Sequence, residues 1–308
     1  MEWLQKNENI DFLCQNRYNI NQLKLFGYSM RLREVKMGGK RSIISLIIVC
    51  LIGCMLCGCD KKQDAEKEIG KNAPKIVVGS DNYPPFNYID ENGKPTGIDV
   101  DIATEAFKRL GYRVEFVNIE WEDKKNLVEN GDIDCIWGCF SIKGRENDYK
   151  WTKPYMVSRQ VVAVNKSSNI YSLSDLEGKI IAVQSTTKPE EIFLNPTDSK
   201  IPEVKEVFSV EDREQIYTYL GKGYVDAISA HETAIRQYMQ DYDMDYRILD
   251  ESIFVTGIGA AFAINDDRGI EEKLSEKFDE MQKDGTMEII VSKYLSNAYK
   301  YLEVDSLE

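Results

Sequence analysis

Residues 75–118 read KIVVGSDNYPPFNYIDENGKPTGIDVDIATEAFKRLGYRVEFVN, and the fold class follows from this segment. Its first six residues form a short apolar run before a Pro-Pro turn, which is typical of a buried strand. Apolar residues then recur at helical spacing over 98–110, and Gly111 is placed to cap the helix C-terminus. A second strand is predicted over 113–117. The segment therefore predicts a strand–helix–strand unit, the building block of a parallel sheet covered by helices.

The same alternation continues to the end of the chain. The further elements that the pattern predicts are helix 121–130, strand 133–138, a helical turn at 173–176, strand 179–184, helix 188–194, strand 204–208, helix 211–220, strand 224–229, helix 231–239, strand 260–264 and helices over about 267–284 and 287–300. The same local pattern occurs twice: a predicted helix ends at a glycine, Gly131 in one case and Gly223 in the other, and a strand that carries an Asp follows. We therefore expect an α/β protein with two similarly built lobes, each a mostly parallel sheet flanked by helices.

The order of the elements predicts how the lobes are connected. A chain that builds one lobe, then the other, and then adds a last strand to the first must cross between them twice. We expect lobe 1 to hold residues 75–162 and 255–308, and lobe 2 to hold residues 163–254. Two crossings make a hinge, and the cleft between the lobes is where a ligand is expected.

The N-terminal region has the order of a secretory signal. Residues 42–59 (SIISLIIVCLIGCMLCGC) carry no charge and follow a basic pair at 40–41. The end of this segment resembles the lipobox of bacterial lipoproteins, whose Cys becomes the lipidated first residue. We expect lipidation at Cys59, because polar sequence begins directly after it. Cys54 is the alternative site, and an uncleaved membrane anchor is the alternative to cleavage.

These features divide the N-terminal region into three parts. Residues 37–59 are expected to be a signal peptide with a lipobox, starting at Met37. Residues 60–74 are charged and free of aromatic residues, which predicts a flexible tether. Residues 1–36 fit no export signal, and we expect them to be a non-native extension. The body of the protein is then tethered to the outer face of the cell membrane.

Composition narrows the possible functions. Residues 60–308 hold 31 Lys and Arg against 48 Asp and Glu, a net charge of −17, which argues against binding nucleic acid. The sequence has a single histidine, so a catalytic triad with histidine or a His-rich metal site is not expected. It has no Gly-rich phosphate-binding loop. Cys135 and Cys139 read as small buried apolar residues. We predict no cofactor, no metal and no catalytic residue.

Two segments carry a resemblance to a known family. DNYPPFNYIDENGKPTGIDVDIATEAFKRLGYRVEFVNIEW (81–121) and NGDIDCIWGCFSIKGRENDYKWTKPY (130–155) resemble the polar amino-acid-binding branch of the bacterial solute-binding proteins, family 3. The likeness continues over about 75–300. It implies the two-lobed periplasmic-binding-protein type II fold. It also implies a monomeric receptor that captures a small amino-acid-like solute and delivers it to the permease of an ABC importer.

The resemblance also implies which residues bind the solute. Arg145 matches the position that binds the carboxylate, where a planar guanidinium makes paired hydrogen bonds that Lys cannot. Tyr83 matches an aromatic lid over the ligand, and Trp121 matches the opposite wall. Thr186 and Thr187 precede a helix, where free backbone N–H groups can hold an anion. On composition alone, each of these residues also fits a structural role: a surface arginine, packed aromatic residues and a helix N-cap.

The sequence departs from the family pattern at several positions. Phe140 stands where the family has Ser, so only its backbone groups remain to bind, and Ser141 is a partial substitute. The acidic residue that pairs with the ligand ammonium falls on His231, with Glu232 beside it. Either Glu232 supplies the anion, or the solute lacks an ordinary α-ammonium group. If neutral His231 accepts a hydrogen bond from the ammonium, protonation of His231 opposes binding, so affinity should fall as the pH is lowered from about 7.5 to 5.5. A histidine that only caps a helix predicts no such pH dependence.

Two other functions fit the same scaffold. Cyclohexadienyl dehydratases resemble this fold, but an enzyme of that kind needs a carboxyl group in the cleft as general acid, and no residue stands out for that role. A sensory module, in which the two lobes signal to a membrane partner, is the other alternative.

Overall fold

The structure is a computed structural model, and it describes residues 72–304. The expected extension, the signal peptide with Cys54 and Cys59, and most of the tether lie outside the described residues. None of the helices between residues 72 and 304 has the length and apolar character that a membrane span requires.

Lobe 1 is built on a five-stranded sheet with the strand order β4-β1-β5-β12-β6. Its strands are β1 (Lys75–Ser80), β4 (Arg113–Asn118), β5 (Cys135–Ile136), β6 (Lys150–Trp151) and β12 (Ala261–Phe262). β1 pairs in parallel with β4 and β5, whereas β12 is antiparallel to β5 and β6. A small ribbon of β2 (Tyr88–Ile89) and β3 (Pro95–Thr96) extends from the loop after β1. As expected, the late strand β12 returns to the first lobe.

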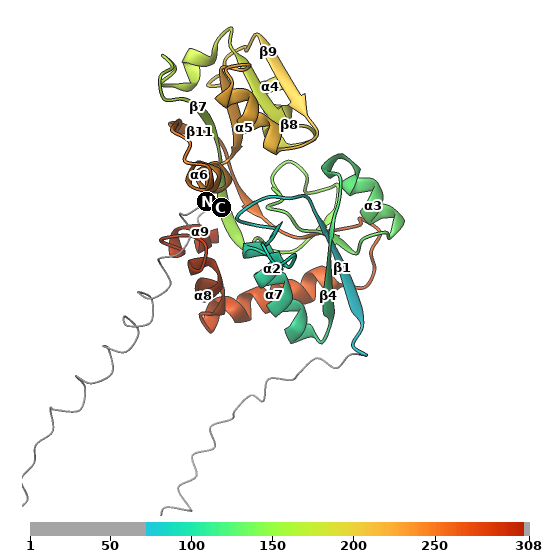
Figure 1. Ribbon diagram of the computed structural model, residues 1–308. Coiled ribbons are helices and arrows are strands. Elements are labelled where there is room, and N and C mark those ends of the chain that lie inside the picture. Colours follow the sequence, from blue (N-terminus) through green and yellow to red (C-terminus); the bar gives the residue numbers. More distant parts are fainter. Residues whose placement is uncertain (1–71, 305–308) are drawn as a thin grey trace, which may run out of the picture. The chain divides into compact units, whose positions relative to one another are not determined.

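Helices cover this sheet. They are α2 (Ile98–Leu110), the 3₁₀ turn η1 (Trp121–Asp123), α3 (Lys124–Asn130), α7 (Ile270–Lys283), α8 (Thr286–Ser292) and α9 (Tyr299–Leu302). α2 and α7 pack side by side, as Figure 1 shows. Gly111 ends α2 in the left-handed conformation with a φ of 83°, which confirms the predicted C-cap. The single helix expected over 287–300 is wrong: the structure has two helices there, α8 and α9, and between them Asn297 adopts a φ of 59°.

Lobe 2 is built on a second five-stranded sheet with the order β11-β7-β10-β8-β9. Its strands are β7 (Met156–Asn165), β8 (Ile180–Gln184), β9 (Glu206–Val210), β10 (Ala227–His231) and β11 (Tyr246–Ile258). Its helical segments are η2 (Leu173–Leu176), α4 (Lys188–Leu194), α5 (Glu214–Gly221) and α6 (Glu232–Asp241). Parallel pairing links β8, β9 and β10, but β7 is antiparallel to both β10 and β11. The α/β class with two lobes is confirmed, but both sheets are mixed rather than mostly parallel, because each has two parallel and two antiparallel strand pairs.

Each sheet separates two apolar cores, which explains why its strands are apolar on both faces. In lobe 2 the side chains of Val161 and Ala163 enter one core, whereas Val162 and Val164 enter the other. In lobe 1 the larger core includes Phe107, Trp137 and Phe278, and a smaller one on the other face includes Trp121 and Phe140. The smaller core of lobe 1 holds two of the residues that the sequence assigned to the binding site.

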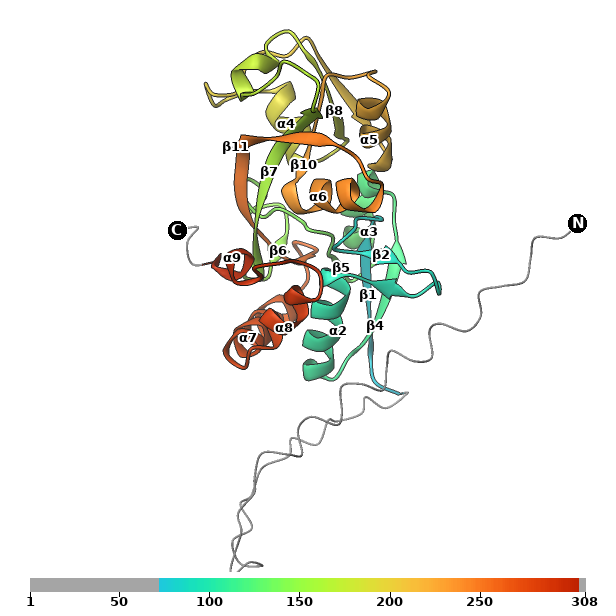
Figure 2. The same ribbon diagram turned by 60° about the vertical axis from the view of Figure 1, so that its left-hand side comes forward.

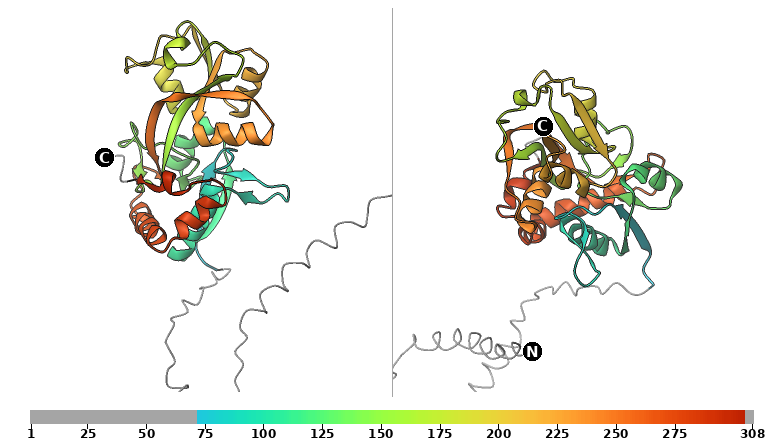
Figure 3. Two further views of the ribbon diagram at one scale, coloured as in Figure 1. Left: turned by 90° about the vertical axis from the view of Figure 1, so that its left-hand side faces the viewer. Right: turned by 45° about the horizontal axis from the view of Figure 1, so that its top comes forward.

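The two longest strands join the lobes. β7 and β11 pair antiparallel from Met156↔Ile258 up to Asn165↔Tyr246, with register shifts between. Figures 2 and 3 show both strands running from the second sheet toward lobe 1. The backbone N–H of Tyr155 donates to the carbonyl of Ile258, and Ser141 forms a β-bridge with the same residue. The lobe limits expected at 162/163 and 254/255 fall inside these two strands, neither of which the sequence predicted.

Candidate functional site

A small pocket, with a cavity volume of about 20 Å³, lies between the two sheets. It is bounded by the segments that follow the carboxyl ends of β1 and β5 in lobe 1 and of β8 and β10 in lobe 2, the edge at which α/β sheets bind ligands. Its lining residues are Tyr83, Trp121, Gly138, Cys139, Phe140, Ser141, Arg145, Gln160, Gln184, Thr187, Lys188, Pro189, Arg213, Ile216, Ser229, Ala230 and His231. Seven of the nine residues predicted to bind the solute are among them; Thr186 and Glu232 are not.

Aromatic side chains of lobe 1 form part of the wall. Tyr83 is 2% exposed and lies in the turn after β1. The backbone N–H of Tyr83 donates to the carbonyl of Asn87, and this bond closes the turn. Trp121 begins η1 and meets the ring of Phe140 edge to face, with ring centroids 5.3 Å apart. Phe140 also contacts the ring of Trp151, at 4.9 Å between centroids. Phe140 therefore belongs to an aromatic cluster and still lines the pocket.

Arg145 lies in the loop between β5 and β6. One guanidinium nitrogen is 3.5 Å from the carbonyl oxygen of Ser141, and another donates to the carbonyl of Thr186 in lobe 2 at 3.3 Å. Within residues 72–304, no carboxylate oxygen lies within 4.0 Å of this guanidinium. Burial lowers the pKa of Arg145 from its ordinary value, because the charged form is partly desolvated. The side chain is thus a partly buried cation without a directly bonded carboxylate in the described part of the chain.

Thr186 and Thr187 lie between β8 and α4. Thr186 has a φ of 57°, which is rare for a β-branched residue. Its carbonyl is approached by both Arg145 and Lys124, and its hydroxyl accepts a bond of 2.7 Å from Lys124. The Thr187 hydroxyl donates to the carbonyl of Gln184 at 2.6 Å, so it does not cap the helix. Only Thr187 of this pair lines the pocket.

His231 ends β10 and is buried in the pocket wall, 5% exposed. Its Nδ1 is 2.6 Å from the hydroxyl of Ser158, and its Nε2 is 2.8 Å from the amide nitrogen of Gln160. Burial, followed by the charges of Arg213 and Arg145, lowers the pKa of His231 to about 3. His231 occupies the N-cap position of α6, but its side chain makes no capping bond. The ring is therefore neutral near pH 7 and faces the pocket.

Glu232 does not reach the pocket. Its two carboxylate oxygens form ion pairs with Arg159 at 2.9 Å and with Arg236 at 2.7 Å. Both partners belong to lobe 2, one on β7 and one on α6. A carboxylate held by two arginines is not available to pair with a bound ammonium group. This contact removes the alternative in which Glu232 supplies the missing anion.

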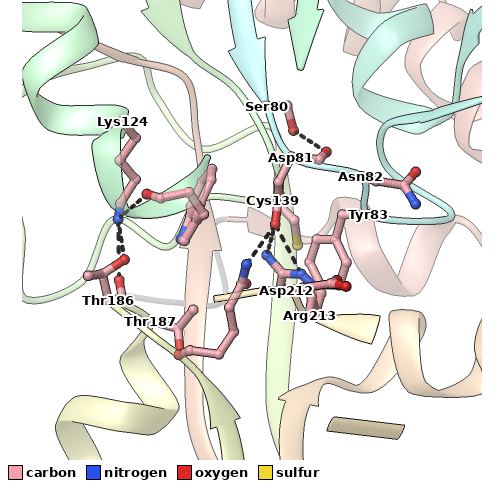
Figure 4. A network of polar contacts seen from close by, with 12 residues as sticks. Ser80, Asp81, Asn82, Tyr83, Lys124, Cys139, Thr186, Thr187, Asp212 and Arg213 are labelled. Atoms are coloured by element: carbon pink, nitrogen blue, oxygen red, sulfur yellow. Dashed lines mark hydrogen bonds and ion pairs between the residues drawn. The ribbon is translucent and has the colours of Figure 1, made fainter. Parts of the chain in front are cut away.

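Sequence reasoning missed a buried ion pair between the lobes. The guanidinium of Arg213 in lobe 2 donates to Oδ2 of Asp81 in lobe 1 at 2.9 Å, and it lies 3.3 Å from the centre of the Tyr83 ring. Figure 4 shows this cluster, with Arg213 against Tyr83. Gln184 donates to the same carboxylate oxygen at 2.9 Å. Asp81 and Arg213 are 132 positions apart, and no motif in the sequence marks them as partners.

Sequence reasoning also missed a second contact between the lobes. Lys124 begins α3 in lobe 1, is 5% exposed, and bonds to the carbonyl of Trp121 and to Thr186 (Figure 4). Burial, followed by the charge of Arg145, lowers the pKa of Lys124 to about 7. In the sequence, Lys124 is one of several charged residues on a short helix, so nothing there distinguishes it. The two lobes therefore meet through a set of buried cations.

Comparison with known proteins agrees with this geometry. Residues 76–297 match the family of bacterial extracellular solute-binding proteins, family 3. The histidine-binding periplasmic protein of Salmonella typhimurium is 30% identical over 231 residues, which cover 71% of this chain and 87% of that protein.

Solved structures give the same result. The substrate binding protein of an amino acid ABC transporter has 29% identity and a TM-score of 0.65, and the match covers 72% of this chain and 99% of that one. An ancestral amino acid-binding protein, AncCDT-1, a precursor of cyclohexadienyl dehydratase, has 25% identity and a TM-score of 0.64, covering 72% and 96%. Both similar proteins carry the name of binding proteins.

Proposed function

Because the chain belongs to the bacterial extracellular solute-binding proteins, family 3, we propose that it is a lipid-anchored receptor on the outer face of the cell membrane. It captures a small amino-acid-like solute in the pocket between its lobes and delivers it to the permease of an ABC importer, acting as a monomer. Cys59 carries the lipid, and residues 60–74 tether the body.

The observation that carries this proposal is Arg145. Its guanidinium lines the pocket, partly buried, and no carboxylate of the described chain is within 4.0 Å. A partly buried cation without a counter-ion is unfavourable, and a solute carboxylate reduces that cost by accepting paired hydrogen bonds. Tyr83, Trp121 and Phe140 supply the apolar walls that an amino-acid-like side chain needs.

Contacts between the lobes support capture by closure. Arg145 and Lys124 of lobe 1 both bond to Thr186 of lobe 2, and Asp81 pairs with Arg213. These contacts form only when the two sheets approach each other. A solute that binds residues of both lobes therefore favours the closed arrangement, as a hinged pair of domains requires.

A receptor fits the pocket better than a dehydratase does. Elimination on this scaffold needs a carboxylic acid in the cleft as proton donor. Among the described residues that line the pocket, none is Asp or Glu. Binding without chemistry is therefore the function that the lining supports.

Removal of Arg145 tests the proposal. The full chain, purified in detergent, is screened by thermal shift against small carboxylates, amino acids included, because a bound solute at 100 times its dissociation constant adds about 2.7 kcal/mol. Arg145→Ala should weaken the best hit by about 3 kcal/mol in calorimetry and leave the fold intact. Arg145→Lys should also bind poorly, because one ammonium cannot replace the planar guanidinium.

Arg113→Ala is the matched control, since Arg113 begins β4 at the opposite end of the strand from the pocket. The affinity of the Arg113→Ala variant should equal that of the wild type. Unchanged affinity in Arg145→Ala would mean that the carboxylate is held elsewhere and that this account of the pocket is wrong.

A further inference from the structure

The charges around the pocket indicate which class of solute it accepts. We propose that the solute is a small carboxylate anion whose α-carbon carries a neutral hydrogen-bonding group, such as a hydroxyl, in place of an ammonium. The inference rests on the proposed function, because it names the solute class of the same pocket.

Cations alone supply the formal charges of the lining. Arg145, Lys188 and Arg213 line the pocket, and no described lining residue is Asp or Glu. The acidic partners of these cations lie outside the lining: Glu191 pairs with Lys188 at 2.6 Å, and Asp81 pairs with Arg213 at 2.9 Å. A zwitterion needs an anion beside its ammonium, and this lining does not offer one.

Two basic side chains near the pocket have no directly bonded carboxylate in the described part of the chain. Lys124 and Arg145 both point to the carbonyl oxygen of Thr186, at 3.5 and 3.3 Å. In the part of the chain from residue 72 to 304, neither has a carboxylate oxygen within 4.0 Å. Their positive charges repel each other, and burial together with this repulsion lowers the pKa of Lys124 to about 7. A solute with net negative charge relieves this repulsion, whereas an amino acid with no net charge relieves it less.

The nearest carboxylates are already paired with arginines. Oδ2 of Asp81 accepts hydrogen bonds from Arg213 and from Gln184, whereas its Oδ1 is buried and accepts none in the described structure; Asp81 is not part of the lining. Glu232 is held by Arg159 and Arg236. Arg213 already balances the charge of Asp81, and two arginines balance that of Glu232, so neither carboxylate offers an unbalanced negative charge to an ammonium.

Neutral polar groups line the pocket beside these basic side chains. His231 is neutral, and its ring nitrogens contact the side chains of Ser158 and Gln160. The amide oxygens of Gln160 and Gln184 are buried and have no hydrogen-bond partner in the described structure, although both residues line the pocket. A ligand hydroxyl can donate to such an oxygen without bringing a second charge into the site. A hydroxy acid therefore satisfies the pocket's acceptors and also its excess of cations.

Matched pairs of probes test the inference. Calorimetry on the full chain in detergent compares each L-2-hydroxy acid with the L-amino acid of the same carbon skeleton: lactate with alanine, malate with aspartate, 2-hydroxyglutarate with glutamate, 2-hydroxyisocaproate with leucine, and phenyllactate with phenylalanine. In the pair that binds best, the hydroxy acid should bind at least about tenfold more tightly, the equivalent of one charge-assisted contact.

His231→Asp should reverse this preference. A carboxylate at this position repels the anion and pairs with an ammonium, so the amino acid should gain about tenfold and the hydroxy acid should lose as much. His231→Asn is the matched neutral control and should keep the wild-type preference. Gln160→Glu, a second lining position, provides the same test if His231→Asp does not fold, as judged by circular dichroism.

The outcomes separate the inference from the function on which it rests. If wild-type protein binds the amino acid of a pair as tightly as the hydroxy acid, or more tightly, the inference is overturned and the receptor function stands. If no probe of either kind binds the wild type, the inference and the proposed function both fail. If neither carboxylate substitution shifts the preference toward the amino acid, the pocket does not select by the charge of the α-substituent, and the inference is overturned.

Discussion

His231 lies in the wall of the pocket with neutral hydrogen-bonding partners at both ring nitrogens. The resemblance to the family pointed to His231, because the acidic residue that pairs with the ligand ammonium falls at this position. Its environment could not be predicted, because Ser158 and Gln160 lie on β7, more than 70 positions away. The same holds for Asp81 and Arg213, which only the approach of two lobes brings together. Sequence patterns locate site residues along the chain, but the contacts that set their charge come from distant strands.

The affinity of the wild type should be insensitive to the charge of His231 between pH 5.5 and 7.5. Burial and two arginines lower the pKa of His231 to about 3, so the ring stays neutral throughout this range and takes up a proton only well below it. The pH slope that the sequence suggested for this window is therefore not expected. Calorimetry with the best-binding solute at four pH values measures the pH dependence of the affinity. A tenfold loss of affinity at pH 5.5 that His231→Asn abolishes would contradict the neutral ring.

At the scale of elements, α2 and the segment after β5 are linked by one buried carboxylate. Asp99, in the first turn of α2, accepts hydrogen bonds of 2.7 Å from the N–H of Cys139 and from the hydroxyl of Tyr155. These bonds fix the start of the segment that leads to Phe140, Ser141 and Arg145.

The helix itself was predicted, because its apolar spacing is a local signal. The strands β7 and β11 were missed, since their residues do not alternate strictly between apolar and polar.

Asp99 should make stability depend on pH. Burial raises its pKa to about 7, above the ordinary value of 3.8, so the folded state holds the proton more tightly than the unfolded state. The stability that this group contributes is fully present below pH 3.8 and is lost as pH rises through about 7. We expect the difference in unfolding free energy between wild type and Asp99→Asn to shrink from pH 4 to pH 7.

Denaturant titrations at pH 4, 5.5 and 7 measure this difference. Asp101→Asn, a change on the same turn of α2 at a residue that pairs with Lys293, serves as control and should give a difference that varies less with pH. A constant difference between wild type and Asp99→Asn over this range would show that Asp99 is ionised in the folded protein at pH 4.

At the scale of the whole molecule, the two-lobed arrangement was predictable from the order of elements. The repeat of a helix ending at glycine before a strand with Asp predicted two similar lobes, and a last strand predicted the return to lobe 1. β12 indeed pairs with β5 and β6. What the sequence could not give is the closeness of the lobes, because the bonds of Lys124 and Arg145 to Thr186 depend on side chains from both. The pocket is a property of the assembled pair of sheets.

Lipid attachment is the prediction that concerns the whole chain in its cell. Metabolic labelling with a fatty acid should mark the protein, because Cys59 ends an apolar segment in a lipobox-like pattern. Cys59→Ala should abolish the label and release the protein from membranes, whereas Cys54→Ala should change neither. The reverse result would place the lipid at Cys54. If the protein carries no label and both variants stay in the membrane fraction, the apolar segment is an uncleaved anchor.

The central claim is that the chain holds a small solute between its two lobes through Arg145. A crystal structure with the tightest-binding solute of the panel tests it most directly. We expect the solute in the pocket between the ends of β1 and β5 and the ends of β8 and β10, in contact with both lobes. Its carboxylate should lie within hydrogen-bond distance, about 3 Å, of the Arg145 guanidinium. A solute bound outside this pocket, or one whose carboxylate is held by other groups while Arg145 stays unpaired, would contradict the account.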